Sequence, residues 1–121
     1  MKLRSMLALV ALVLFAGVAF AQSIETGEFT ASPNQEGFSL NTGKGDRVYI
    51  ETIAFDKGFK APPKVHVFLS GFDAKGDETG VVRVHVSASK VTKTGFTLRV
   101  KTWGESIVGS AWGTWMAVGV R

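Results

Sequence analysis

The 121-residue chain contains no cysteine, which excludes disulfide bonds and attachment of a lipid to an N-terminal thiol. Proline is also scarce, with 3 residues against 14 glycines, so the composition is neither collagen-like nor typical of a disordered chain. Beyond the first few residues there is no run of Lys or Arg, and we therefore expect no nucleic-acid partner. These absences indicate a small globular protein that must fold without disulfide cross-links.

The N-terminal segment has the pattern of a secretory signal peptide. Lys2 and Arg4 precede an uncharged apolar run over residues 6–20, and the triplet Ala19-Phe20-Ala21 fits a cleavage site. The run is shorter than the roughly 20 residues of a comfortable membrane span, so an uncleaved anchor is the less favoured alternative. We predict a signal peptide over residues 1–21, one domain over residues 22–121, no membrane span after cleavage, and a secreted, periplasmic or other extracytoplasmic location.

The predicted mature part carries 12 basic and 10 acidic residues, a net charge of +2. Apolar and polar residues alternate with a period of two over residues 48–53, 65–70, 81–88 and 96–101. A fifth run, residues 112–120, is apolar on both faces, and residues 24–40 are expected to add one or two strands. Turn signals separate the runs and no window has helical spacing, which predicts an all-β sandwich.

Alternation also predicts which side chains face the core. We expect two apolar rows to pack against the opposite sheet, namely Val82, Val84, Val86 and Phe96, Leu98, Val100. The opposite rows of the same strands hold Arg83, His85, Arg99 and Lys101, and these would face water or another chain.

Enzymatic chemistry is poorly supported. Ser70 lacks the G-x-S-x-G pattern of a nucleophile elbow, and His66 and His85 lie within strands without a third ligand at metal spacing. The loop at residues 73–78 contains acidic residues but departs from the EF-hand pattern. We therefore expect a protein that is not an enzyme and that has neither a metal nor another cofactor.

Trp103 is unusual because it stands where a predicted strand enters a glycine-containing loop. An indole at such a place can stack on the apolar face of a pyranose while charged neighbours bind the hydroxyls. It can equally cap the core, a role expected for one of Trp112 and Trp115. The residues alone leave both interpretations of Trp103 open.

Several segments occur in an order that resembles the H-type lectin family, which includes discoidin C-terminal domains and N-acetylgalactosamine-specific agglutinins. The segments are Ile53-Ala54-Phe55, Pro63 to Asp73, Val82 to Ala88, Val91 to Leu98, Lys101-Thr102-Trp103 and Trp115 to Gly119. The resemblance implies a six-stranded antiparallel β-sandwich that forms a homotrimer. It also implies shallow sites for glycans with galactose or N-acetylgalactosamine near the contacts between protomers.

The resemblance further suggests which residues bind the sugar. Arg83 matches the strand arginine that donates to sugar hydroxyls, and Trp103 matches the tryptophan that packs against the ring. Gly104 and Glu105 follow the T-W motif, and Asp46 matches the family's N-terminal aspartate when a two-residue gap is allowed. From its strand position alone, Arg83 could instead be a solvated charge or pair with a neighbouring chain.

One departure from the family pattern motivates a second hypothesis. Gly109 occupies the position, six residues after the tryptophan, where an aromatic side chain lines the site in a well-known member. The alternative function is therefore a trimeric structural or adhesion module that keeps the fold and does not bind sugar.

Overall fold

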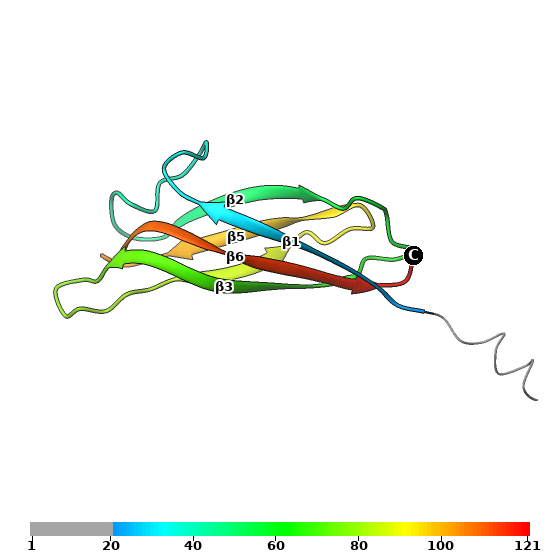
Figure 1. Cartoon of the computed structure of the whole chain (residues 1–121). Helices are drawn as coiled ribbons and strands as arrows, with labels where there is room; N and C mark the ends of the chain where they lie inside the picture. Colours follow the sequence, from blue (N-terminus) through cyan, green and yellow to red (C-terminus); the bar gives the residue numbers. More distant parts are fainter. Residues whose placement is uncertain (1–20) are drawn as a thin grey trace, which may run out of the picture.

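Two three-stranded antiparallel sheets form the two layers of a β-sandwich in the computed structural model, which describes residues 21–121 (Figure 1). One sheet has the order β1–β6–β3, with β1 over Ser23–Ala31, β6 over Ile107–Gly119 and β3 over Lys64–Lys75. The other has the order β2–β5–β4, with β2 over Arg47–Ala54, β5 over Gly95–Thr102 and β4 over His85–Ser89. The predicted six-stranded antiparallel sandwich is confirmed.

The predicted signal peptide falls almost entirely on residues 1–20, which lie outside the described residues. Within residues 21–121, no helix is long and apolar enough to cross a membrane.

Strand β5 shows how the period of two builds the core. Its residues Phe96, Leu98, Val100 and Thr102 are buried while the residues between them are partly exposed, as one-sided burial of a strand requires. The Phe96 ring meets the Trp115 indole of the other sheet edge to face, with centroids 5.2 Å apart. A Cβ atom on Gly27 would lie 2.5 Å from that indole, so β1 needs a glycine where the tryptophan crosses it.

The two tryptophans of β6 have opposite environments. Trp115 is 5% exposed and belongs to the core, whereas Trp112 is 39% exposed on the outer face of its sheet. The prediction that one of them is a core residue is confirmed, and the two-sided apolar character of this strand leaves a tryptophan in contact with solvent.

The predicted strand over residues 81–88 is wrong in its first half, because β4 begins only at His85. Val82 is 38% exposed and does not face the core, while Val84 and Val86 pack against it as predicted. The cause is local hydrogen bonding: the N–H of Val81 donates to Asp77 Oδ1, and its carbonyl accepts from the N–H of Asp77, both at 3.0 Å. These bonds tie the segment to its own loop instead of to the neighbouring strand.

One further boundary differs from the prediction, at the start of β6. Strand β6 starts at Ile107, five residues before the predicted run over residues 112–120, so the turn after β5 is short. The N-terminal region forms one strand, followed by turns that bring fully buried Leu40 against β6, where its carbonyl accepts from the Val108 N–H at 2.9 Å. The short turn matters because it places Trp103 beside the loop after β3.

Candidate functional site

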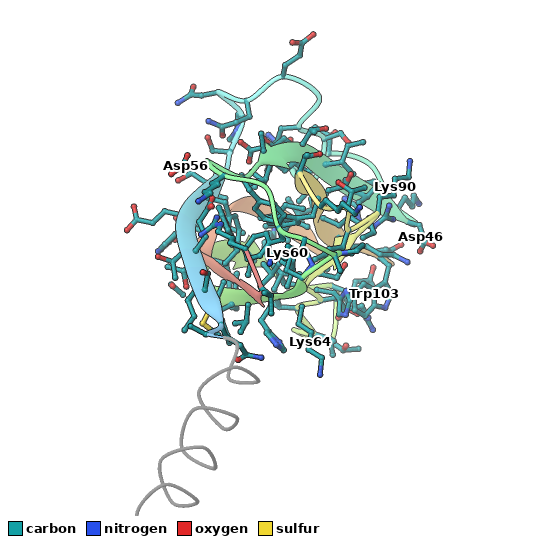
Figure 2. All side chains as sticks on the ribbon, turned by 90° about the vertical axis from the view of Figure 1, so that its right-hand side faces the viewer. Asp46, Asp56, Lys60, Lys64, Lys90 and Trp103 are labelled. Carbon is teal, nitrogen blue, oxygen red and sulfur yellow. The ribbon has the colours of Figure 1, made fainter. Side chains whose placement is uncertain are left out.

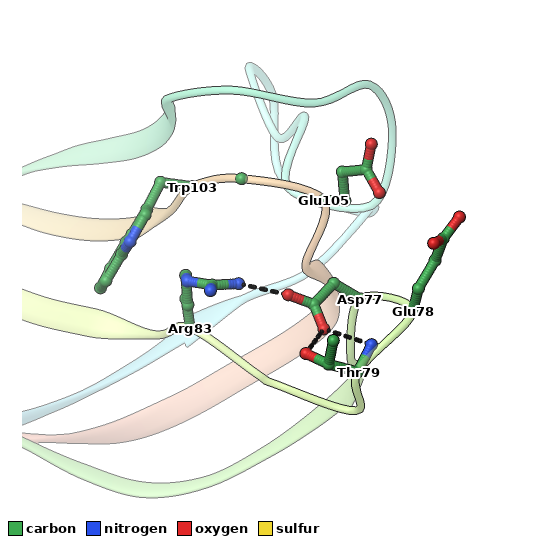
Figure 3. A pocket seen from close by; sticks show the side chains of 7 residues that line it. Asp77, Glu78, Thr79, Arg83, Trp103 and Glu105 are labelled. Atoms are coloured by element: carbon green, nitrogen blue, oxygen red, sulfur yellow. Dashed lines mark hydrogen bonds and ion pairs between the residues drawn. The ribbon is translucent and has the colours of Figure 1, made fainter.

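An open pocket of about 540 Å³ lies at the end of the sandwich where β3 and β5 finish, opposite the end marked by the C-terminus in Figure 1. Two loops line it, and the residues are Asp77, Glu78, Thr79, Arg83, Trp103, Gly104 and Glu105 (Figure 3). Four of the five residues predicted from sequence are therefore brought together: Arg83, Trp103, Gly104 and Glu105.

Trp103 forms one wall of this pocket. It follows the last residue of β5, is 37% exposed, and lies outside the buried core. Figure 3 shows its indole on the opposite side of the pocket from Glu78 and Glu105, with Arg83 between them. The Lys101 ammonium lies 6.0 Å from the centroid of the indole ring. An exposed aromatic face next to charged side chains is the arrangement that suits stacking of a sugar ring.

The backbone of Arg83 is held by side chains from the end of β5 and the turn after it. Its N–H donates to Ser106 Oγ at 3.0 Å, and its carbonyl accepts from Thr102 Oγ1 at 2.7 Å. Thr102 and Ser106 are both fully buried, so these bonds are shielded from water. Arg83 is thus held in place although it lies outside a regular strand.

Gly104 allows the Arg83 side chain to lie close to the turn. The glycine has φ +68°, a left-handed conformation that other residues rarely adopt, and a Cβ at this position would stand 3.4 Å from Arg83 Nη1. A larger residue here would strain the turn and crowd the guanidinium.

Asp77 holds the guanidinium from the opposite side. Arg83 Nη1 donates to Asp77 Oδ2 at 2.9 Å, and the two side chains are 28% and 17% exposed (Figure 3). The other carboxylate oxygen, Oδ1, accepts from Thr79 Oγ1 at 2.6 Å, from the Thr79 N–H at 2.9 Å and from the Val81 N–H at 3.0 Å. The Thr79 hydroxyl and the Arg83 guanidinium hold the pKa of Asp77 well below its usual range, so the carboxylate stays ionised near neutral pH.

Arg47 holds together the backbone of two loops next to the pocket. Its guanidinium donates to the carbonyls of Gly104 at 3.0 Å and Ser106 at 2.7 Å. It also donates to the carbonyls of Thr42 at 2.7 Å and Gly45 at 3.1 Å. Arg47 therefore ties the loop before β2 to the turn that carries Gly104.

Asp46 lies outside the residues that line the pocket. Its Oδ2 is 3.3 Å from the Lys101 ammonium, and its side chain is 77% exposed. The end-on view of Figure 2 places Asp46 and Trp103 on the same flank of the sandwich. Asp46 is thus linked to the site through Lys101, and within residues 21–121 it forms no hydrogen bond or ion pair with Arg83 or Asp77.

Gly109 also lies outside the pocket lining, within β6, where an added Cβ would stand 3.5 Å from the carbonyl of Asp73. At the rim of the pocket, the exposed Glu105 carboxylate lies 3.9 Å from the Lys44 ammonium.

Asp77, Glu78 and Thr79, in the loop after β3, line the pocket but were not predicted as binding residues. The acidic residues of this loop suggested only a poor calcium site. A signal was present: Asp77, Thr79 and Gly80 follow the pattern of a turn in which an aspartate accepts from the backbone two residues later, and Gly80 has φ +83°. No sequence pattern predicts the ion pair between Asp77 and Arg83, because it depends on the path of the residues between them.

The pocket offers hydrogen-bond donors, carboxylates and an aromatic face. Among residues 21–121, no group of three or more His, Cys, Asp or Glu side chains is arranged to hold a metal ion. The arrangement is suited to binding a polar ring-shaped ligand.

Comparison with known proteins shows the family of the chain. The sequence pattern of the H-type lectin domain matches residues 50–118, a range that includes most of β2, all of β3 to β5, Arg83, Trp103 and most of β6. The chain belongs to the H-type lectin family. Membership supports a carbohydrate-binding role and points to a binding protein rather than an enzyme.

Relatives of this H-type lectin domain include one curated protein and two solved structures. The protein named "ATP synthase subunits region ORF 7" of Fuscovulum blasticum is 32% identical over 84 residues, which cover 69% of this chain and 71% of the relative. Two structures of discoidin II of Dictyostelium discoideum share 27% identity and superpose with TM-scores of 0.72 and 0.73. The match covers 83–84% of this chain but only 38% of discoidin II, so the likeness concerns one domain of that protein.

Proposed function

We propose that this protein is a secreted lectin that binds glycans bearing galactose or N-acetylgalactosamine through shallow, repeated sites. The observation that carries the proposal is the meeting of Trp103 and Arg83 in one open pocket. The indole would stack on the apolar face of the sugar ring, and the guanidinium would donate to hydroxyl oxygens. The family likeness supports the same two residues.

A single site of this kind is expected to be weak. Each hydroxyl that bonds to the protein was already bonded to water, so the net gain of each hydrogen bond is small. The pocket is also open, so part of the sugar would remain in contact with solvent. Useful avidity would come from several sites on one particle, which can raise apparent affinity roughly 10²–10⁴-fold where the geometry allows joint binding.

A glycan array probed with the protein purified after expression of the full chain tests the proposal. We expect signals that are strongest for terminal galactose and N-acetylgalactosamine at high surface density. Absence of binding to any glycan, by protein shown to be folded, would contradict it.

We propose that the protein assembles as a homotrimer through the outer face of the β1–β6–β3 sheet. Ile24, Phe68 and Trp112 are 62%, 49% and 39% exposed on the strands of this sheet. The partly exposed Met116 of β6 lies between Thr26 of β1 and His66 of β3. A patch of this kind favours burial against another copy.

Sedimentation equilibrium tests the assembly. The native protein is expected to sediment as a trimer at micromolar concentration, and Phe68→Glu as a smaller species. Ile50→Glu is a matched control, because Ile50 is 57% exposed on the other sheet and its change should leave the trimer intact. A native monomer would contradict the assembly.

The secreted location is tested separately, by cell fractionation and by sequencing the N-terminus of the purified protein. We expect the protein outside the cytoplasm with Gln22 as its first residue. Cytoplasmic protein that retains Met1 would contradict it.

The second candidate function is a structural or adhesion module on the same fold. Asp46 and Gly109 favour it, because neither lies in the pocket that holds Arg83 and Trp103. Retention of the protein on galactose-agarose and elution by free galactose would favour the lectin. Passage of folded trimer through the column would favour the structural module.

A further inference from the structure

We propose that Asp77 sets the specificity of the Arg83 site by holding the guanidinium for neutral sugar hydroxyls and by excluding acidic sugars. The inference rests on the proposed function, because it concerns the ligand class of that same pocket. It assigns a role to a residue that lies six positions before Arg83, in a loop outside the β-strands.

The acceptor capacity of Asp77 is largely taken up by the protein itself. Oδ1 accepts three hydrogen bonds, two from Thr79 and one from Val81, and Oδ2 accepts one from Arg83. A carboxylate offers about four lone-pair positions. Asp77 therefore acts on a ligand chiefly through Arg83, which makes it a positioning residue.

Arg83 keeps most of its donors for a ligand. A guanidinium carries five N–H donors, and within residues 21–121 its side chain makes one hydrogen bond, to Asp77. The Arg83 side chain also lies close to Gly104, so it is confined by both the loop that holds Asp77 and the turn after β5. Because the side chain is already held in place, its free N–H groups can donate to sugar hydroxyls with a smaller loss of conformational entropy.

The same ion pair would reject an acidic sugar. A free arginine attracts a carboxylate or sulfate through its uncompensated positive charge, but here the Asp77 carboxylate already balances the charge of the Arg83 guanidinium. A sugar carboxylate would also face the Asp77, Glu78 and Glu105 carboxylates that line the pocket. The nearby ammonium groups of Lys44 and Lys101 lie beside Glu105 and Asp46, so they offer an anion little uncompensated positive charge.

Two sugars that differ in one group test the inference. The protein is titrated with methyl galactoside and with its uronic acid, in which a carboxylate replaces the C6 hydroxymethyl group. We expect the native trimer to prefer the neutral sugar by at least about fivefold, which is the range of charge discrimination at a partly exposed site. Rising salt should reduce this preference.

Asp77→Asn should reverse the order of the two sugars. The substitution keeps the shape of the side chain but removes the charge that pairs with Arg83, so the neutral sugar should bind about fivefold more weakly and the acidic sugar more tightly. The matched control is Asp73→Asn, because Asp73 also bonds a side chain, Ser110 Oγ at 3.0 Å, but lies outside the pocket lining. The control should leave both affinities unchanged.

Combining Asp77→Asn with Arg83→Lys distinguishes positioning from a direct contact. If Asp77 acts through Arg83, the two losses of neutral-sugar affinity should not add, and the double variant should resemble Arg83→Lys alone. Additive losses would overturn the positioning role. The melting temperature of each variant shows whether a loss of binding is only a loss of folding.

The outcomes separate the inference from the proposed function. Equal native affinities for the two sugars, or a preference for the acid, would overturn the inference while the lectin function stands. Failure of the folded native protein to bind either sugar would overturn both.

Discussion

Arg47 and Arg83 lie at the same end of the sandwich and have opposite surroundings. The guanidinium of Arg47 donates to backbone carbonyls from two loops, those of Thr42, Gly45, Gly104 and Ser106 being the shortest contacts. The guanidinium of Arg83 has one carboxylate partner and lines an open pocket. Hydrogen-bond partners, more than residue type, therefore distinguish a structural arginine from one available to a ligand.

Between the two arginines, the larger expected effect on stability is at Arg47. Arg47→Ala would remove charge-assisted hydrogen bonds to carbonyls of two loops, of which those to Gly104 and Ser106 are partly buried, and we expect a loss of about 2–3 kcal/mol in the free energy of unfolding. Arg83→Ala breaks one partly exposed ion pair and should cost less than about 1 kcal/mol. Urea titrations measure both, and equal losses would remove the contrast between the two residues.

How far the sequence could predict these roles depends on which contacts are local. The period of two in residues 96–101 predicted strand β5 and its buried face, because burial follows directly from alternation. The valines at residues 81–84 have the same alternation but form no strand, since Asp77 captures the backbone of Val81. Alternation of apolar residues does not show that a side chain such as that of Asp77 will accept the backbone hydrogen bond of a predicted strand residue.

The candidate site was predictable only in part for a similar reason. Trp103 stands out by its position at a strand end, and a family pattern adds Arg83, Gly104 and Glu105; all four meet in the pocket. Asp46 required a gap in that pattern and lies against Lys101 instead. Arg47 and Asp77 could not be selected, because their partners are carbonyls and a guanidinium brought together only by the fold of the loops.

The next prediction contrasts Trp103, which lines the pocket beside Arg83, with Trp115 in the core. Trp103→Ala should reduce galactose affinity at least tenfold, because it removes the stacking surface, and should cost only about 1 kcal/mol of stability at a site that is 37% exposed. Trp115→Ala removes a core side chain and should cost about 3–5 kcal/mol. Trp103→Ala protein that melts as early as Trp115→Ala would mean that Trp103 caps the core.

Conservative exchange of each arginine sharpens the comparison further. Arg83→Lys keeps the charge and loses the planar fork, so galactose affinity should fall about threefold to tenfold while the melting temperature stays nearly fixed. Arg47→Lys should do the reverse, lowering the melting temperature because an ammonium cannot reach carbonyls on two loops. Calorimetric titration and thermal unfolding of both variants measure the two effects, and a shared pattern would contradict the division of roles.

The smallest expected effect is on pH dependence. The pKa of Asp77 is lowered in the folded protein, so its contribution to stability is present above the unfolded value of about 3.9 and is lost as pH falls through the lower folded value. Stability due to the Asp77–Arg83 pair should therefore be constant from pH 7 to about 5 and decline only in stronger acid. The difference in unfolding free energy between native protein and Asp77→Asn, followed against pH, measures it; a difference that disappears near pH 6 would contradict the lowered pKa.

The most direct test of a sugar site formed by Trp103 and Arg83 is the response of the three indole N–H resonances to galactose. The chain has three tryptophans, Trp103, Trp112 and Trp115, and single Trp→Phe variants assign their signals. We predict that the Trp103 resonance shifts with a saturable dependence on galactose concentration, while the buried Trp115 and the outer-face Trp112 do not respond. A folded protein whose Trp103 resonance stays fixed at saturating galactose, or in which only Trp112 moves, would contradict the account.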